Sequence, residues 1–431
     1  MLESFKSAFK VSELRTKLLY TLGMIFIFRL GAHIPVPGVI PERFAELVNS
    51  GAIFGFFDIV SGGALKNFSV FAMGIMPYIN ASIILQLLTV VIPHLEKLHK
   101  EGEEGRKKIS QYTRYLTVVL AFIQGIGMVV GVSGSMQNPG PIAFVMAALT
   151  ITAGTTFLMW MGEQITERGI GNGISLLIFA GIVARLPNAT YELIKKIQIG
   201  EINAVYAIVV LIMFVVVVAL VVVEQQGQRK IPVNYAKRIV GRRMYGAQNT
   251  YIPFKINPSG VIPVIFASSL LTFPLQIAQS FGVQAKWLRD FSYWLRPEGF
   301  WYNLFYVIFI VFFAYFYTQV TLNPQEISKN IRENGGSIPG IRSDKMEEYL
   351  TRVLNRIILP GSLFLALIAL LPTLVQRLFN FPSELAYLLG GTSLLILVGV
   401  DLDTMAQVEA LLKMHHHDGL VRKGHIRSRN L

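Results

Sequence analysis

Long apolar runs recur along the chain and are separated by short polar segments. A hydrocarbon core of about 30 Å takes roughly 20 residues of helix, and runs of that length are present throughout. The run at 206–223, YAIVVLIMFVVVVALVVV, is continuously apolar rather than alternating, which argues against a transmembrane β-barrel. The pattern predicts ten membrane-spanning helices, at about 18–34, 69–93, 115–133, 142–162, 170–186, 204–223, 260–279, 301–321, 357–376 and 386–408.

The composition agrees with this pattern. Hydrophobic residues make up 53% of the 431 residues and charged residues only 15%, against about 25% in soluble domains. No polar stretch is long enough to form a soluble domain of its own. We therefore expect an all-α polytopic membrane protein.

The distribution of the positive charges predicts the orientation. The chain has 39 Lys and Arg residues and a formal net charge of +13. The loop at 224–259 is rich in Lys and Arg, whereas the loop at 134–141, GSMQNPGP, has none. Short loops with many Lys and Arg residues stay on the cytoplasmic side. Both termini are therefore predicted to be cytoplasmic.

The loop at 187–203 divides the ten runs into two sets of five, which hints at an internal repeat. In each set the second run has unusual flanks, rich in Gly and Pro. Inverted repeats with broken helices are also typical of secondary transporters, so this pattern does not choose a function.

Two loops are longer than a connection requires. The loop at 224–259 alternates apolar and polar residues on both sides of Gly241, which predicts a β-hairpin with Arg238, Arg242 and Arg243 at its basic tip. In the loop at 322–356 we expect a short helix, a turn that presents Arg342, and a second helix. Ordered basic loops favour docking of an anionic partner, either RNA or an acidic protein face.

Residues 56–86, FFDIVSGGALKNFSVFAMGIMPYINASIILQ, are apolar but do not suit one continuous helix. The charges of Asp58 and Lys66 and the Gly62–Gly63 pair indicate that 56–67 is a short, loosely packed element that does not cross the membrane. The span then starts near Pro77, because proline is tolerated in the first turn of a helix. Several isoleucines follow such breaks, and Ile75 and Ile79 share a helix face.

Candidate catalytic and metal chemistry is sparse. The chain has no cysteine, which excludes disulfides and thiolate ligands. The run His415–His417 is more typical of a solvated tail than of a metal site, and GIGNGIS at 169–175 lacks the preceding strand of a nucleotide site and indicates a tight turn into a helix. Arg29 lies at the outer end of the first run, within snorkelling reach of the interface. We expect no enzyme activity, cofactor or metal, and the lack of charged groups at mid-span argues against an ion pump.

Seven segments have distinctive sequences: SGGALKNFSVFAMGIMPYINASIILQLLTVVIP (61–93), EGEEGRKKISQYTRY (101–115), GEQITERGIGNGIS (162–175), VNYAKR (233–238), GVIPVIFASS (260–269), PGIR (339–342) and GGTSLLILV (390–398). Together they resemble the SecY family, the channel subunits of the bacterial Sec translocon. The similarity runs from the first span to MAQVEALL at 405–412, which is nearly the whole chain.

The resemblance implies a clamshell of two pseudo-symmetric halves, helices 1–5 and 6–10, around an hourglass pore in the bacterial cytoplasmic membrane. The halves would be residues 1–187 and 204–412, joined by an external hinge loop at 188–203 and followed by a cytoplasmic tail at 413–431. Such a channel passes unfolded secretory polypeptides and releases transmembrane segments sideways into lipid. The implied partners are the subunits SecE and SecG, the ATPase SecA, the ribosome with its RNA, signal peptides and nascent polypeptides, and membrane lipids.

The resemblance also implies roles for individual residues, carried over by motif position. The pore ring would be Ile75, Ile79, Ile174, Ile178, Ile265 and Ile396. The plug would be Phe57, Asp58, Ile59, Val60, Ser61, Gly62, Gly63, Ala64, Leu65, Lys66 and Asn67. Small and polar residues that suit the lateral gate are Ser82, Gln86, Ser268, Ser269 and Thr272. The docking residues would be Arg238, Arg242, Arg243 and Arg342.

The rival hypothesis is a secondary transporter, and a flippase for lipid or peptidoglycan precursors is a more distant one. A transporter should bring polar or charged side chains together at its broken helices. Here isoleucines follow the breaks, which favours a channel.

Overall fold

The computed structural model describes residues 9, 11–40, 58, 61–131, 134, 136–235, 238–240, 243–245, 249–281, 294–295, 299–379 and 381–423. The chain divides into two compact units. The first comprises Met1–Glu192, Gln279–Phe281 and Ile396–Leu431, and the second comprises Leu193–Ala278 and Gly282–Leu395.

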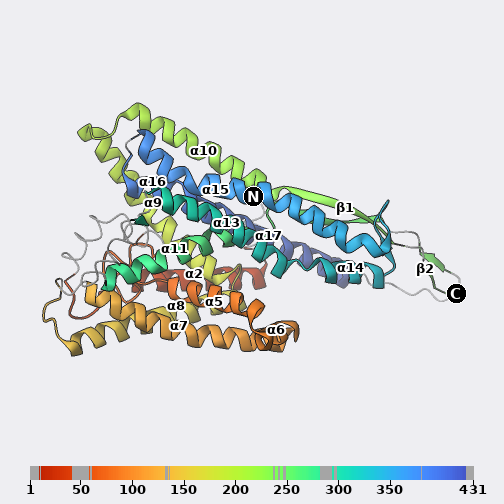
Figure 1. Ribbon diagram of the computed structural model, residues 1–431, viewed down its shortest axis with the longest axis horizontal. Coiled ribbons are helices and arrows are strands. Elements are labelled where there is room, and N and C mark those ends of the chain that lie inside the picture. The colour runs from red at the N-terminus through yellow and green to blue at the C-terminus, as the bar shows by residue number, and fades with distance from the viewer. Residues whose placement is uncertain are drawn as a thin grey trace. The chain divides into compact units, whose positions relative to one another are not determined.

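The first unit is helical. Its helices are α2 (Ser12–Gly31), α5 (Met76–Val91), α6 (Pro93–Lys100), α7 (Glu103–Gly131), α8 (Pro141–Arg168), most of α9 (Gly173–Ile199) and the part of α17 (Gly391–Lys423) from Ile396 onward. Helix α7 packs along both α5 and α8 (Figure 1). Gly125 of α7 lies against α8, since a Cβ added to it would be 3.4 Å from the carbonyl oxygen of Ala148, an ordinary contact distance.

The second unit combines helices with a small sheet. Its elements are α10 (Ala204–Gln226), β1 (Gln228–Tyr235), β2 (Arg238–Val240), β3 (Arg243–Tyr245), β4 (Asn249–Lys255), most of α11 (Ile262–Phe281), α13 (Phe300–Thr321), α14 (Pro324–Glu333), β5 (Gly336–Ser337), the 3-10 turn η2 (Ser343–Lys345), α15 (Met346–Phe379), α16 (Ser383–Leu389) and the start of α17. Helix α13 packs along α15.

The predicted hairpin at 224–259 is confirmed. Strands β1 and β4 are antiparallel, with Ile231 opposite Ile252, and β2 pairs with β3 nearer the tip. A third strand, β5, was not predicted, because it has only two residues and pairs with the end of β1 at Asn234 and Tyr235. The sheet order is β4-β1-β5.

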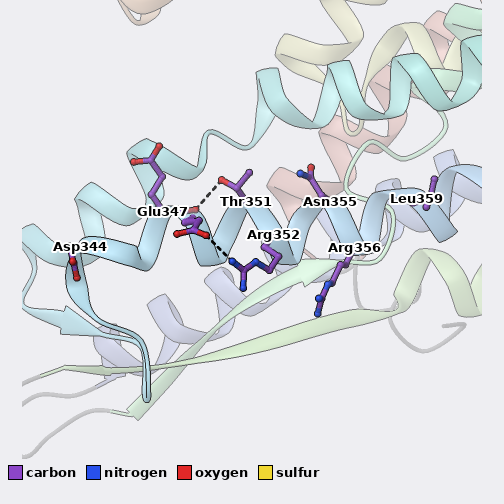
Figure 2. Close-up of a pocket in the computed structure, with 8 residues that line it drawn as sticks. Asp344, Glu347, Thr351, Arg352, Asn355, Arg356 and Leu359 are labelled. Carbon is purple, nitrogen blue, oxygen red and sulfur yellow. Dashed lines mark hydrogen bonds and ion pairs between the residues drawn. The ribbon is translucent and has the colours of Figure 1, made fainter.

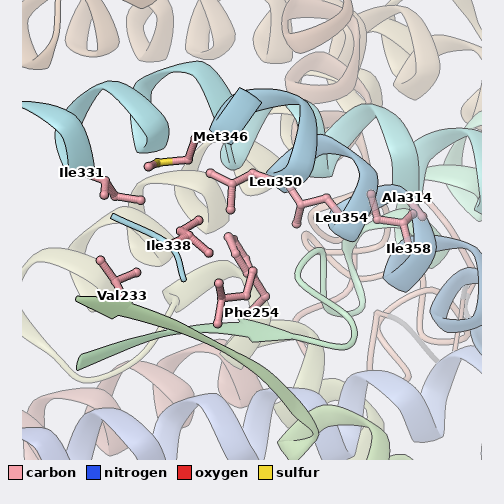
Figure 3. Close-up of a cluster of buried hydrophobic side chains, with 10 residues drawn as sticks. Val233, Phe254, Ala314, Ile331, Ile338, Met346, Leu350, Leu354 and Ile358 are labelled. Atoms are coloured by element: carbon pink, nitrogen blue, oxygen red, sulfur yellow. The ribbon is translucent and has the colours of Figure 1, made fainter. Parts of the chain in front are cut away.

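A buried hydrophobic cluster joins this sheet to α13, α14 and α15 (Figure 3). Val233 and Leu350 are both fully buried in it. The two long loops therefore form one packed body rather than two separate connections. Its members are Ile231, Val233, Phe254, Ala314, Ile331, Ile338, Met346, Leu350, Leu354 and Ile358.

Each of the ten predicted spans overlaps a helix, although the run at 69–93 begins in turns before α5 and the run at 386–408 covers parts of both α16 and α17. Within the described residues, seven helices are long and apolar enough to cross a membrane, or eight if α5 and α6, bent by 100° at their junction, form one broken span. The runs at 18–34 and 260–279 fall on α2 and α11, which do not meet that measure. Helix α2 has charged residues near both ends, and the apolar part of α11, Ile262–Thr272, is short.

The predicted external loop at 188–203 is mostly helix, because α9 continues through Pro187 to Ile199. Good helix formers such as Glu192, Leu193 and Lys195 follow the proline, and Leu193 is buried. A proline inside a long helix is tolerated where its surroundings satisfy the freed carbonyl group. The helix therefore continues beyond the end of its apolar run, and the predicted loop began too early.

Candidate functional site

The predicted plug segment lies in the first unit and is built from tight turns rather than a helix over Ser61–Gly74. Gly62 and Gly63 have φ of +70° and +88°, values that only glycine adopts without strain. A Cβ on Gly62 would lie 2.7 Å from the Cα atom of Gly181 in α9. The backbone of the segment therefore packs directly against the backbone of α9.

Asp58 is fully buried and holds this segment in shape. Its Oδ1 atom accepts a hydrogen bond from the Lys66 backbone N–H at 2.7 Å, and its carbonyl oxygen accepts one from the Gly63 N–H at 2.8 Å. Its Oδ2 atom forms an ion pair of 2.6 Å with Nη1 of Arg185 in α9. A carboxylate in this position is stabilised by the opposite charge and by the backbone donor together.

A second arginine reaches the segment from another helix. Nη1 of Arg29, in the last turn of α2, donates to the carbonyl oxygen of Gly62 at 2.6 Å. The expected role of Arg29 was snorkelling to the membrane interface, and the structure instead places its guanidinium on this carbonyl. Arg185 was missed altogether, because its partner is far away in the sequence.

The expectation that the plug segment is loosely packed is wrong for its described residues. Ala64, Leu65 and Phe68 are all fully buried. The segment continues into a short pairing with residues 34–36, in which Val36 donates to the Phe68 carbonyl and Val70 to that of Ile34, both at 2.9 Å. Packing is possible because Asp58 is paired. Of the predicted plug residues, Phe57, Ile59 and Val60 lie outside the described part.

The segment leads into α5, which carries two of the predicted pore residues. Gly74 has a φ of +56° and contacts Ser61, and Ile75 then caps the helix, with Pro77 in its first turn as predicted. Ile75 and Ile79 are 4% and 5% exposed.

Helix α9 carries the second pair of predicted pore residues. The side chain of Asn172 caps its start, because Oδ1 accepts from the backbone N–H groups of Ile174 and Ser175, each at 3.1 Å. This confirms that GIGNGIS forms a tight turn into a helix. Ile174 is half-buried and Ile178 is 3% exposed.

Two helices from the ends of the chain hold that turn. The Ile170 N–H donates to Thr21 Oγ1 of α2 at 3.2 Å, and the Gly171 N–H donates to Gln407 Oε1 of α17 at 2.9 Å. Leu14, Ile170 and Val408 pack together beside it. Both chain ends therefore support the start of α9. The side chains of the His415–His417 run, further along α17, lie outside the described part.

The remaining predicted pore residues are divided between the units. Ile396 is buried in the part of α17 that belongs to the first unit, and Ile265 is half-buried in α11 of the second unit. A ring that includes all six residues stays a prediction.

Three of the predicted gate residues, Gln86, Ser268 and Thr272, donate hydrogen bonds within their own helices. In the first unit, Gln86 Nε2 donates to Ser82 Oγ at 3.3 Å. In the second unit, Ser268 donates to the Ile265 carbonyl at 2.9 Å and Thr272 to the Ser268 carbonyl at 2.7 Å. Hydroxyl groups bonded in this way to a preceding turn need no partner on another helix.

The predicted docking residues belong to the second unit. Arg238 begins β2 and Arg243 begins β3, while Arg242 lies outside the described part. Arg342 is highly exposed, with 81% of its side chain accessible, and its Nε atom lies 3.4 Å from Oδ1 of Asp344. The predicted turn that presents Arg342 is confirmed, since Gly340 has a φ of +78° there.

A groove lined by charged and polar side chains runs along α15 next to this turn (Figure 2). Acidic residues lie near its start and basic residues further along, and Glu348 pairs with Arg352 at 2.7 Å. The lining residues are Asp344, Glu347, Glu348, Thr351, Arg352, Asn355, Arg356 and Leu359.

Comparison with known proteins points to one family. The SecY family profile matches residues 69–405. The chain is 45% identical over 435 residues to the protein translocase subunit SecY of Aquifex aeolicus, covering 98% of this chain and 100% of that protein. It is 44% identical over 428 residues to the corresponding subunit of Escherichia coli K12, covering 97% and 96%.

Solved structures agree in fold. A SecY protein whose plug domain stabilises the closed state of the translocation channel and maintains a membrane seal matches with a TM-score of 0.66, at 20% identity over 92% of both chains. Canine Sec61 in a ribosome–channel complex of the endoplasmic reticulum matches with a TM-score of 0.61, at 18% identity over 92% of both chains.

Proposed function

The chain belongs to the SecY family of protein translocase subunits, and we propose that it is the channel through which unfolded secretory polypeptides cross the membrane. The observation that carries this proposal is the junction of the turn segment at 58–74 with α5 and α9. There, buried aliphatic residues at two helix starts adjoin a compact element held by buried charges.

The proposed seal has a physical basis. Ile79 and Ile178 present only methyl and methylene groups, which cannot replace the hydration shell of an ion. A narrow aliphatic constriction also loses water easily, so it blocks ions while it stays flexible enough to admit an extended chain. We infer that the ring formed by these residues with Ile75, Ile174, Ile265 and Ile396 is the constriction, and that 57–67 is the plug.

Sideways release needs helices that part without strong polar contacts between them. The local hydrogen bonds of Ser268 and Thr272 support a gate of this kind, because opening would leave both hydroxyls satisfied. Ser82, Gln86 and Ser269 complete the proposed lateral gate. An apolar segment of the passing chain then enters lipid through the hydrophobic effect.

Energy would come from partners that dock on the exposed loops. The family membership and the ribosome-bound Sec61 structure support a ribosome partner. We propose that the basic hairpin tip meets ribosomal RNA and that Arg342 engages SecA. SecE and SecG are the further proposed subunits. The chain is a multi-pass membrane protein. We propose that it lies in the bacterial cytoplasmic membrane with both termini cytoplasmic, an orientation that the Lys and Arg bias of its loops supports.

Reconstitution tests this proposal directly. The chain, purified with its partner subunits, is placed in vesicles with SecA, ATP and a preprotein that carries a signal peptide. We expect the preprotein to become resistant to external protease only when ATP is present. Protease sensitivity with ATP, together with saturable uptake of a small molecule, would favour the secondary transporter instead.

A further inference from the structure

We propose that Arg185 and Arg29 are positioning residues that latch the plug segment in its closed place through the buried carboxylate of Asp58. This inference rests on the proposed function, because it takes 58–67 as the element that closes the channel. It adds a specific charge contact that determines how readily that element leaves.

One face of α9 links the latch to the constriction. Ile174, Ile178, Gly181 and Arg185 follow one another at spacings of four, three and four residues, so they lie along one face of the helix. The first two are predicted pore residues. The third meets the backbone of Gly62, and the fourth pairs with Asp58. The face of α9 that carries the predicted pore residues therefore also holds the plug segment.

The latch has two arms from two helices. Arg185 of α9 binds the Asp58 side chain, and Arg29 of α2 binds the Gly62 carbonyl, with both contacts at 2.6 Å. Both contacts fall within the same short stretch, Asp58–Gly62, so displacement of the plug segment has to break them together.

The plug cannot leave without breaking the ion pair. Asp58 is fully buried and the Arg185 side chain is 15% exposed, so water screens the attraction only weakly. Removal of one partner leaves a buried charge without its counterpart, which is far more costly than removal of both. Loss of Arg185 alone should therefore displace the plug segment. When both Asp58 and Arg185 are replaced by neutral residues, the segment should stay in place better than when only one of them is replaced.

The chain has no cysteine, which allows a clean measurement of plug position. Ser61 is 4% exposed and close in size to cysteine, so Ser61→Cys gives a single buried thiol. In proteoliposomes with the partner subunits, we would measure its rate of reaction with a membrane-impermeant maleimide, and the resting ion conductance in parallel. The variants are Arg185→Gln, Arg185→Lys, Asp58→Asn and the double variant Asp58→Asn/Arg185→Gln.

We expect Arg185→Gln to raise the labelling rate and the conductance by about tenfold or more, as for the loss of one partner of a buried pair. The labelling rate and conductance of Arg185→Lys should lie between those of Arg185→Gln and the wild type, because lysine keeps the charge but lacks the planar set of donors of arginine. The double variant should label more slowly than Arg185→Gln alone.

The matched control is Arg114→Gln, which breaks the 2.8 Å ion pair between Arg114 in α7 and Glu163 in α8, two helices that supply neither arm of the latch. It should leave both readouts unchanged. An unchanged labelling rate in Arg185→Gln, or an equal rise in Arg114→Gln, would overturn the latch. Arg185→Gln could also label faster with no rise in ion conductance, even when Ile79→Asn and Ile178→Asn are added to it. That result would support the latch and contradict the proposal that the chain is a channel.

Discussion

Asparagine at both Ile79 and Ile178 is expected to raise the resting ion conductance of the closed channel by about tenfold or more. The amide groups would hydrate a constriction that is otherwise aliphatic and would offer oxygen atoms to a passing cation. Both positions are buried at the starts of helices that contact the plug segment, so the change acts where we place the seal. Voltage-clamped planar bilayers with the purified complex provide the measurement.

Two controls separate sealing from general damage. The double change to valine keeps the positions aliphatic and β-branched, so it should leave the conductance near the wild-type value. Ile123→Asn adds the same amide to α7 at a position that is 52% exposed, where we expect no leak. Equal conductance in the asparagine double variant and the wild type would remove Ile79 and Ile178 from the seal.

Arg342→Glu is expected to reduce SecA-driven export of a preprotein by about tenfold or more, because it reverses the charge of the residue that we propose as the docking contact for SecA. The Arg342 side chain is 81% exposed and lies next to the turn at Gly340, so the change should not disturb the hydrophobic cluster below. Export is measured by protease protection in inverted membrane vesicles, and insertion of the variant by its level in the membrane.

Arg332→Glu is the matched control, since Arg332 is exposed in α14 of the same loop region and undergoes the same charge reversal. We expect near-normal export from it. Normal export by Arg342→Glu, or an equal defect in Arg332→Glu, would show that docking does not depend on this turn.

The features that follow from local pattern could be predicted from the sequence. Long apolar runs predicted the seven or eight helices that are long and apolar enough to cross a membrane within the described residues, because a helix in lipid must satisfy its backbone internally and cover about 20 residues with apolar side chains. Alternation identified the hairpin of β1 and β4, and the glycines near 335 and 340 identified the end of α14 and the turn at Arg342. Motif positions provided the candidate pore residues.

The features that depend on distant partners could not be predicted. The charge of Asp58, taken alone, predicts loose packing. In the structure Arg185, which is 127 positions later in the sequence, pairs with it and allows close packing. The two-residue strand β5 has no pattern of its own and exists because it pairs with β1. The continuation of α9 to Ile199 was not predicted, because the residues after 186 are not a long apolar run. The helical spacing of Ile174, Ile178, Gly181 and Arg185 is visible in the sequence. It could have indicated that Arg185 lies on the same helix face as the predicted pore residues.

The most direct test of the central claim is site-specific photocrosslinking during transport. A photoreactive amino acid is placed at Ile79, at Ile178 or at the exposed position Ile123, and a preprotein is arrested midway by a folded domain at its C-terminus. A protein-conducting channel predicts crosslinks to the arrested polypeptide from positions 79 and 178 and none from position 123. Crosslinks of equal yield from all three positions, or crosslinks from position 123 alone, would contradict it.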